Sequence, residues 1–210
     1  MNPKLKNALE WTYCIVIAII IALAVKFFIG TPTVVKQTSM NYTLVEGERL
    51  WLNRWVRTVK GKYKIGDIVT FEAPSQVNLT LAQINFDNPI AIYDYEPQGL
   101  WNKFVYYVLE TSKTSYIKRI IGVEGDHIKI EDGKVYRNGK ELEEEYLEQG
   151  IETTSKRYSD IIVPEDYVFV MGDNRPHSTD SRDFGCIPIS KIESKVAFRF
   201  WPLSKFGKIE

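Results

Sequence analysis

The sequence predicts a mainly β fold of antiparallel sheets, preceded by one transmembrane helix. Short runs of alternating apolar and polar residues recur along the chain, and turn-forming residues separate them. Thirteen glycines, nine prolines and 13% aromatic residues in a chain of 210 fit a fold of many strands and turns. The N-terminal region holds one long apolar run, which exceeds the length of an ordinary strand.

The apolar run at residues 11–29 is expected to be a membrane anchor. It reads WTYCIVIAIIIALAVKFFI and carries a single charge, Lys26. As a helix it would extend roughly 28 Å, close to the hydrocarbon thickness of a bilayer. The run is longer than the core of a cleavable signal peptide, and Gly30-Thr31-Pro32 follows it, so we expect it to be uncleaved. A buried core helix stays open as the alternative.

The anchor divides the chain into a short tail and a large domain. We expect residues 1–10 to be a cytoplasmic tail and residues 31–210 to lie outside a cell membrane that the chain crosses once. Lysines flank the run on both sides, so the charge bias that orients such helices is weak. These lysines are Lys4 and Lys6 before the run and Lys26 and Lys36 around its end.

Strand-like segments follow the anchor in order. They are residues 33–37, 49–53, 67–71, 116–126, 167–171 and 195–201. Between Ala73 and Ser115 the pattern is irregular and indicates a surface insertion, in which Leu100–Leu109 fits a short helix or a strand. Residues 127–140 indicate a pair of tight hairpins, because Asp132-Gly133 and Asn138-Gly139 suit primed turns. The acidic run at residues 141–148 is expected to be a solvated face.

Composition argues against several kinds of function. The formal net charge is zero, which leaves no basic excess for binding nucleic acid. The two histidines, His127 and His177, lie far apart and no spaced cysteine pairs accompany them, so we expect no metal site and no cofactor. Cys14 and Cys186 are expected to be free thiols. His177 adjoins Ser178, and neighbouring residues rarely aim at each other, which disfavours a catalytic serine–histidine pair.

A lysine interrupts the apolar run at residues 116–126. On a strand, Lys118 shares a face with Ile120, which suggests that its amine is partly desolvated. Desolvation disfavours the ammonium form and lowers a lysine pKa, so such an amine can act as a base near neutral pH. A long side chain that reaches solvent from the sheet edge is the open alternative.

Two further segments are candidates to work with this lysine. Ser39 lies about ten residues past the anchor. Residues 172–185 follow a hydrophobic strand directly and collect turn formers, hydroxyl groups and opposite charges. Loops of this composition carry function when a rigid scaffold holds them.

In this order behind one anchor, the three segments resemble the bacterial type I signal peptidases with a single anchor. The matching pieces are Ser39-Met40 with Thr43-Leu44, Gly66-Asp67-Ile68-Val69, residues 116–126, residues 172–185 and Phe198-Arg199-Phe200-Trp201-Pro202. Residues 73–115 and 140–163 lie outside the resemblance. The resemblance implies a signal-peptidase-like catalytic domain with a small inserted β subdomain at about residues 123–170.

The resemblance implies a serine endopeptidase that removes signal peptides from exported preproteins. Ser39 would be the nucleophile and Lys118 its general base, a known variant of the catalytic triad. The backbone N–H of Ser39 would be one oxyanion donor, and the Gln37 amide would supply the second. Met40 would roof the lysine or line the substrate pocket. The substrate would pair as an extended strand with an enzyme strand edge.

The resemblance also implies a set of supporting residues. Ser178 would hydrogen-bond the lysine amine and orient it. Asp180 and Arg182 would pair to hold their loop. Asp173 and Arg119 complete the supporting set.

The sequence departs from the family at two positions. Proline usually stands where this chain has Tyr42, so the turn after Ser39 lacks the fixed φ of proline. Serine or glycine stands in some members where this chain has Gln37.

Two other functions fit parts of the pattern. A self-cleaving serine–lysine switch protein shares the dyad, but the chain has no DNA-binding helical module, and the anchor argues against a soluble repressor. A non-catalytic anchored binding protein could keep the scaffold. Such a protein has no need to retain both Ser39 and Lys118, which favours the peptidase.

Overall fold

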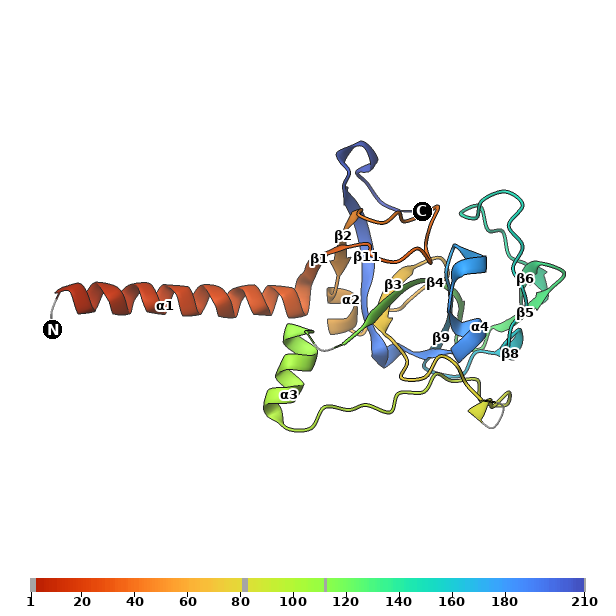
Figure 1. Cartoon of the computed structure of the whole chain (residues 1–210), viewed down its shortest axis with the longest axis horizontal. Coiled ribbons are helices and arrows are strands. Elements are labelled where there is room, and N and C mark those ends of the chain that lie inside the picture. Colours follow the sequence, from red (N-terminus) through yellow and green to blue (C-terminus); the bar gives the residue numbers. More distant parts are fainter. Residues whose placement is uncertain (1–2, 81–82, 112, 210) are drawn as a thin grey trace.

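A long helix projects from a β domain in the computed structural model, which describes residues 3–80, 83–111 and 113–209 (Figure 1). The helix α1 spans Pro3–Ala24, and one π-helical turn, Val25–Ile29, continues it. Within its segment Lys6–Ile29, the most apolar 18-residue stretch has a mean hydropathy of 2.6, and none of that stretch is buried in the domain. The helix is therefore long and apolar enough to cross a membrane, and it is not a core helix of this domain.

The larger sheet has seven strands in the order β1-β2-β11-β3-β4-β9-β10, all antiparallel to their neighbours. The strands are β1 Gly30–Val34, β2 Arg49–Asn53, β3 Ile68–Glu72, β4 Ser115–Val123, β9 Tyr167–Met171, β10 Ile187–Pro188 and β11 Ile192–Trp201. The predicted segments 49–53 and 167–171 coincide with β2 and β9. The segment predicted at 33–37 is a strand only at its start, because β1 begins at Gly30, directly after the helix.

A smaller sheet lies between β4 and β9 in the sequence. Its order is β7-β6-β5-β8, with β5 His127–Glu131, β6 Lys134–Arg137, β7 Lys140–Glu141 and β8 Asp160–Ile162. Asp132-Gly133 and Asn138-Gly139 have positive φ angles of 49°, 77°, 54° and 77°, as primed hairpin turns require. The expected subdomain range, 123–170, extends into β9, which belongs to the larger sheet.

Three apolar clusters hold the sheets together. Ile128 and Ile161 of the small sheet pack with Phe169 and Met171 of β9, so the small sheet shares a core with the large one. A second cluster packs around Val69, Phe71 and Phe184. The third contains Met40, Leu44, Leu50, Leu52 and Ile68, and it lies under the loop that follows β1.

The irregular segment at residues 73–115 runs along the domain and ends beside α1 (Figure 1). Its last part is helical: α3 spans Leu100–Phe104, and a π-helical turn, Val105–Leu109, continues it. Of the two structures that the sequence allowed for Leu100–Leu109, the helix is the one formed. The segment is not wholly superficial, because Leu79 and Ala91 are buried in the core clusters.

The acidic run at residues 141–148 is only partly a solvated face. Glu144 turns inward and forms an ion pair with Arg175, which is fully buried. A buried guanidinium requires a partner, since an unpaired charge in the interior is costly. Sequence pattern did not indicate this pair, because the two residues are 31 positions apart, with β8 and β9 between them.

Candidate active site

Ser39 lies in a tight turn that follows β1 and rests on the third apolar cluster. The backbone N–H of Leu44 donates to the carbonyl oxygen of Met40 at 2.7 Å, which closes the turn. The N–H of Asn174 donates to the carbonyl oxygen of Ser39 at 3.0 Å, and its side-chain amide donates to that of Thr38 at 3.0 Å. The loop after β9 therefore holds the backbone on both sides of the serine hydroxyl.

Lys118 projects from the middle of β4 and meets that hydroxyl. Its Nζ lies 2.6 Å from the Oγ of Ser39 and 3.2 Å from the carbonyl oxygen of Ile117. The whole residue is 2% exposed, so the side chain does not reach solvent from the sheet edge. The geometry is that of a hydroxyl and a base within proton-transfer distance.

Burial sets the protonation of this amine. Loss of hydration disfavours the ammonium form and lowers the pKa of Lys118 to about 8 from an ordinary value of 10.5. The carboxylates of Asp180 and Asp173 oppose this change, but they do not outweigh it. A substantial fraction of the amine is therefore neutral slightly above neutral pH.

Asp173 and Arg119 form a buried two-pronged ion pair behind the serine and lysine. Arg119 Nε donates to Asp173 Oδ1 at 3.0 Å, and Nη2 donates to Oδ2 at 2.9 Å. Thr43 Oγ1 donates to the same carboxylate at 2.5 Å. Arg119 is the neighbour of Lys118 on β4, so this ion pair joins the lysine strand to the loop after β9 and to the serine turn.

Asp180 and Arg182 form a second buried pair in the same loop. Arg182 Nε and Nη2 each lie 2.8 Å from an oxygen of Asp180, and both residues are fully buried. Burial alone would raise the pKa of Asp180, but the Arg182 guanidinium holds it below its usual range. Asp180 also caps the short helix α4, Ser181–Phe184, and accepts from the N–H of Gly172 at 3.1 Å.

Ser178 does not make the hydrogen bond expected of it. Its Oγ is buried without a hydrogen-bond partner among the described residues, and the lysine amine instead contacts Ser39 and the Ile117 carbonyl. The hydroxyl does lie close behind the site. A Cβ placed on Gly172 would fall 2.3 Å from Ser178 Oγ and 2.4 Å from the carbonyl oxygen of Ser39.

Met40 is not a pocket residue in this structure. It is fully buried in the third cluster, because the turn directs it and Leu44 inward beneath Ser39. The cavity of about 300 Å³ at the serine is lined by other residues. These are Lys36, Gln37, Thr38, Ser39, Tyr116, Lys118, His177 and Thr179.

Gln37 and Tyr42 lie on opposite sides of the serine turn in the sequence. Gln37 lines the cavity at the serine. Tyr42 has a φ of 82°, which lies in the left-handed region. A proline cannot adopt this angle. The chain therefore follows a path here that excludes proline, as a φ less restricted than that of proline allows.

Sequence reasoning missed several residues that support the site. Gly172 has to be glycine, since any side chain there would overlap Ser39 and Ser178. Arg175 joins the loop after β9 to the small sheet through Glu144 and through Thr153, 2.5 Å from its Nη1. Gly172 lies in a segment that sequence did single out, whereas Thr153 carries no recognisable signal.

A larger groove adjoins the cavity at the serine. Its volume is about 620 Å³, and it shares Lys36, Gln37 and Tyr116 with that cavity. One wall is residues 31–37 and the other is residues 113–117. Among the strands that the structure describes, β1 pairs with β2 alone, and within β4 the residues before Arg119 pair only with β3. Both walls thus present free strand edges.

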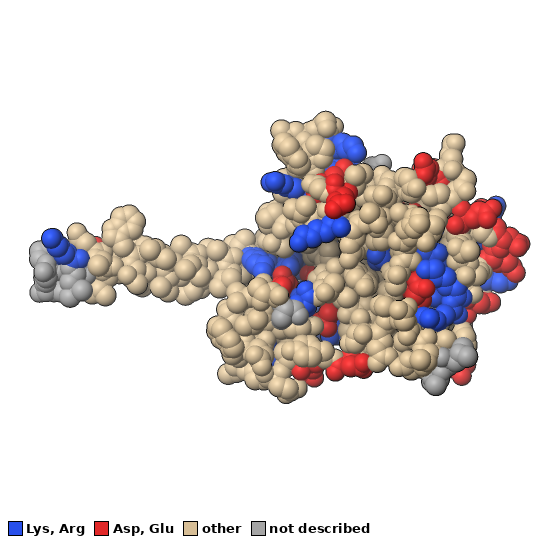
Figure 2. All heavy atoms as spheres, in the orientation of Figure 1, with Lys and Arg blue, Asp and Glu red and all other residues tan. Residues whose placement is uncertain are grey.

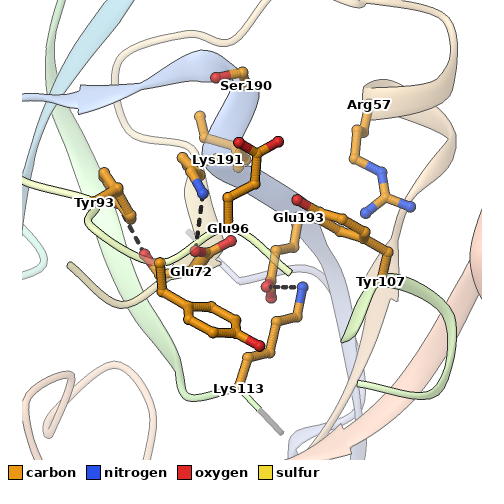
Figure 3. Close-up of a pocket in the computed structure, with 11 residues that line it drawn as sticks. Arg57, Glu72, Tyr93, Glu96, Tyr107, Lys113, Ser190, Lys191 and Glu193 are labelled. Atoms are coloured by element: carbon orange, nitrogen blue, oxygen red, sulfur yellow. Dashed lines mark hydrogen bonds and ion pairs between the residues drawn. The ribbon is translucent and has the colours of Figure 1, made fainter. Parts of the chain in front are cut away.

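A third cavity, of about 420 Å³, lies away from the serine and lysine (Figure 3). Four of its charged groups form two ion pairs. Lys113 contacts Glu193 at 2.6 Å, and Lys191 contacts Glu72 at 2.9 Å. The first of these pairs fastens the end of the irregular segment to the sheet. Among the residues that the structure describes, no group of His, Cys, Asp and Glu side chains is arranged to hold a metal ion.

The chain is similar to proteins of one family over nearly its whole length. The sequence profile of the family described as "Signal peptidase, peptidase S26" matches residues 8–201. A signal peptidase I of Bacillus licheniformis is 32% identical, with 98% of this chain and 95% of the relative covered. Signal peptidase IB of Staphylococcus aureus (strain COL) is 32% identical, with 96% and 93% covered.

A solved structure of a signal peptidase I from Enterococcus faecalis also aligns with this chain. The alignment covers 64% of this chain and 96% of the other, with 24% identity and a TM-score of 0.38. A TM-score of 0.38 is too low to support an argument about the fold.

Proposed function

Because this chain belongs to the signal peptidase I family of hydrolases, peptidase S26, we propose that it removes signal peptides from exported preproteins through Ser39 and Lys118. The observation that carries the proposal is the contact between a buried amine and a hydroxyl. Nζ and Oγ lie 2.6 Å apart, and burial lowers the pKa of the amine to about 8. A neutral amine at this distance can activate the serine, which is a weak nucleophile by itself.

In the first half of the reaction, Ser39 Oγ attacks the scissile carbonyl carbon as its proton passes to Lys118 Nζ. The carbonyl oxygen becomes an oxyanion. The backbone N–H of Ser39 and the side-chain amide of Gln37 are the donors that would stabilise it. The C–N bond then breaks, the lysine ammonium gives its proton to the leaving amine, and an acyl-serine ester remains.

In the second half, the neutral amine of Lys118 takes a proton from a water molecule that attacks the ester. The oxyanion forms again and collapses, and the C–O bond to Ser39 breaks. Lys118 returns the proton to the serine oxygen. The signal peptide leaves as a carboxylic acid, and the lysine is neutral again, so it is a base in both halves and an acid when each intermediate breaks down.

The groove beside the cavity suits an extended substrate segment. The free edge of β1, up to Val34, and that of residues 115–118 in β4 can pair with its backbone, which provides affinity without reading side chains. Val35, Leu50 and Leu52 are among the residues that line the groove, so it offers apolar spaces for side chains. Small side chains next to the cut would fit such spaces.

The apolar helix α1 would anchor the enzyme where its substrates emerge. In our proposal the helix crosses the cell membrane once, with residues 1–10 in the cytoplasm and the catalytic domain outside. The cleavage site of a preprotein emerges at the same surface. Confining both molecules to this surface raises their effective concentration.

The test is processing of a preprotein by the full-length protein in vesicles, with the cut located by mass. Ser39→Ala and Lys118→Arg should abolish cleavage, because a guanidinium stays protonated and cannot act as a base. Ser204→Ala and Lys129→Arg, at exposed positions, are the matched controls and should cleave normally. Near-normal cleavage by Ser39→Ala or Lys118→Arg would exclude the mechanism. If the wild-type protein does not cleave the preprotein, the non-catalytic binding protein is the function that remains.

A further inference from the structure

The helix formed by Leu100–Leu109 is tied to the last turn of the apolar helix α1. Lys26 Nζ donates to the carbonyl oxygen of Leu109 at 2.9 Å and to that of Val108 at 3.3 Å. These carbonyls lie at the C-terminal end of the helix, where backbone oxygens lack helical partners and a cation is favourable. In Figure 1 the helix lies beside the end of α1 and leans back towards the side from which α1 enters the domain.

Ion pairs fix this helix to the sheet as well. Arg54 Nη2 contacts Glu110 at 2.7 Å, directly after the helix. Lys113 contacts Glu193 of β11 at 2.6 Å, as Figure 3 shows. Tyr106 packs inward and is buried. The helix is therefore held at three points, and its position relative to the domain is defined.

The outward face of the helix is apolar and unusually exposed. Leu100 is 90% exposed and Trp101 is 71% exposed. Other exposed apolar side chains lie at the end of the apolar helix and on or next to the short helix α2, Trp55–Thr58. Arg57 of α2 donates to the carbonyl oxygen of Phe27 at 2.9 Å, so α2 lies beside the end of the apolar helix. We call the six residues the apolar collar: Phe28, Ile29, Trp55, Val59, Leu100 and Trp101.

Charge is distributed in a way that matches this collar. On the face shown in Figure 2, the surface over α3 next to the projecting helix carries few charged side chains, whereas the opposite end of the domain carries many of both signs. A contiguous exposed apolar patch marks an interaction surface. The elements that carry the collar are the end of the apolar helix, α2 and α3, and they lie on the side of the domain from which α1 projects (Figure 1), so the hydrocarbon surface is the partner in reach.

From this geometry we propose that the Leu100–Leu109 helix is a second membrane contact, with Leu100 and Trp101 inserted at the lipid interface beside the anchor. This inference rests on the membrane anchoring proposed above. Tryptophan is favoured at this depth, and Lys103 on the same helix can reach lipid phosphates. A single helix allows the domain to tilt, whereas a second contact fixes the height and direction of the groove above the bilayer.

Fluorescent labels on the full-length protein in phosphatidylcholine–phosphatidylglycerol vesicles test the inference. Single cysteines replace Leu100, Ile19 in the middle of α1, and Phe86, in a Cys14→Ser background that keeps the buried Cys186. Phe86 is the matched control, since it is 64% exposed and its segment lies at the end of the domain away from α1 (Figure 1). Nitroxide-bearing lipids then quench each label according to its depth.

We expect a nitroxide near the headgroups to quench the label at position 100, and a nitroxide deep in the acyl chains to quench the label at position 19. The label at position 86 should be unaffected. Quenching at 19 without quenching at 100 would overturn this inference and leave the anchor in place. Absence of quenching at both positions would overturn the anchoring and this inference together.

An activity measurement separates the contact from general folding. A Leu100→Ser, Trp101→Ser variant in vesicles should cleave a bilayer-inserted preprotein several-fold more slowly, while it cleaves a short soluble peptide at the wild-type rate. Phe86→Ser should leave both rates unchanged. Equal rates of the double variant and the wild type on the inserted preprotein would contradict a role for the contact in positioning the groove.

Discussion

The amine of Lys118 and the hydroxyl of Ser39 lie 2.6 Å apart although 79 residues separate them in the sequence. Two structural elements bring them together. Lys118 is fixed on β4, in the interior of the seven-stranded sheet. The turn that contains Ser39 is hydrogen-bonded to the loop after β9 through Asn174. β4 and β9 are paired, so the base and the support of the nucleophile share one rigid unit.

The pH dependence of cleavage should follow the protonation of Lys118. Only the neutral amine can accept the serine proton, and the pKa of Lys118 is about 8. We expect kcat/KM to rise about tenfold per pH unit below that value and to level off above it. Cleavage of a soluble peptide between pH 6 and 10 measures this, and a flat profile would exclude a titrating base.

Replacement of Lys118 by methionine should abolish cleavage and stabilise the protein. Between pH 8 and 10.5 the unfolded chain binds the lysine proton and the folded chain does not, so wild-type stability rises with pH across this window. Below pH 8 both states are charged, and the folded state bears the cost of a buried ammonium. The unfolding free energy of Lys118→Met should exceed that of wild type by on the order of 1–3 kcal/mol at pH 6, since one pKa unit corresponds to about 1.4 kcal/mol.

Thermal unfolding of wild type and Lys118→Met at several pH values measures this gain. The difference in unfolding free energy should be largest below pH 8 and should shrink towards pH 10.5. Lys129→Met, at an exposed position, is the control and should show no such pH-dependent gain. If Lys118→Met is less stable than wild type at pH 6, burial of the lysine ammonium does not lower the stability of the folded protein.

Replacement of Asp173 by asparagine should damage both folding and activity. Arg119 would keep its buried charge and lose the Asp173 carboxylate, and breaking a buried ion pair typically costs about 3–5 kcal/mol. Thr43 would also lose its charged acceptor, so the serine turn would shift. Denaturant unfolding and the peptide cleavage rate measure the two effects. Asp160→Asn, which affects an exposed pair with His127, should change neither.

A methyl group at Gly172 should prevent cleavage by moving the nucleophile. The added Cβ would lie 2.4 Å from the carbonyl oxygen of Ser39, so the serine turn has to move. Gly122→Ala is the matched control, because its Cβ would meet Ile128 side-chain atoms at 2.9 Å, away from the serine. Both variants should lose stability, and only Gly172→Ala should lose kcat. Equal kcat values would show that the close approach at Gly172 is not needed for catalysis.

Local pattern predicted the strands whose two faces differ and the turns that need positive φ. The segments 49–53 and 167–171 and both primed hairpin turns coincide with the structure. The short strand β8 was missed, because three residues carry no alternation that could be recognised. The helical form of Leu100–Leu109 depends on its tertiary contacts with Lys26 and the sheet, which sequence does not display.

The sequence predicted which residues form the candidate site better than it predicted the contacts between them. Ser39 and Lys118, named from a resemblance, do meet, and the expected pair of Asp180 and Arg182 forms. Asp173 and Arg119, expected only as supporting residues, also pair with each other. The hydrogen bond from Ser178 to the amine and the pocket position of Met40 do not occur. Both errors concern side-chain directions within a few ångströms, which depend on how the turn packs and not on residue type.

The most direct test of the account is the protonation of Lys118 itself. With carbon-13 at the lysine Cε positions, the Lys118 resonance is the one that disappears in Lys118→Arg, and its chemical shift can be followed with pH in the full-length protein. We predict a midpoint near 8. A midpoint at or above 10.5, the ordinary lysine value, would mean that the amine is charged when it meets Ser39 and would contradict the proposed mechanism.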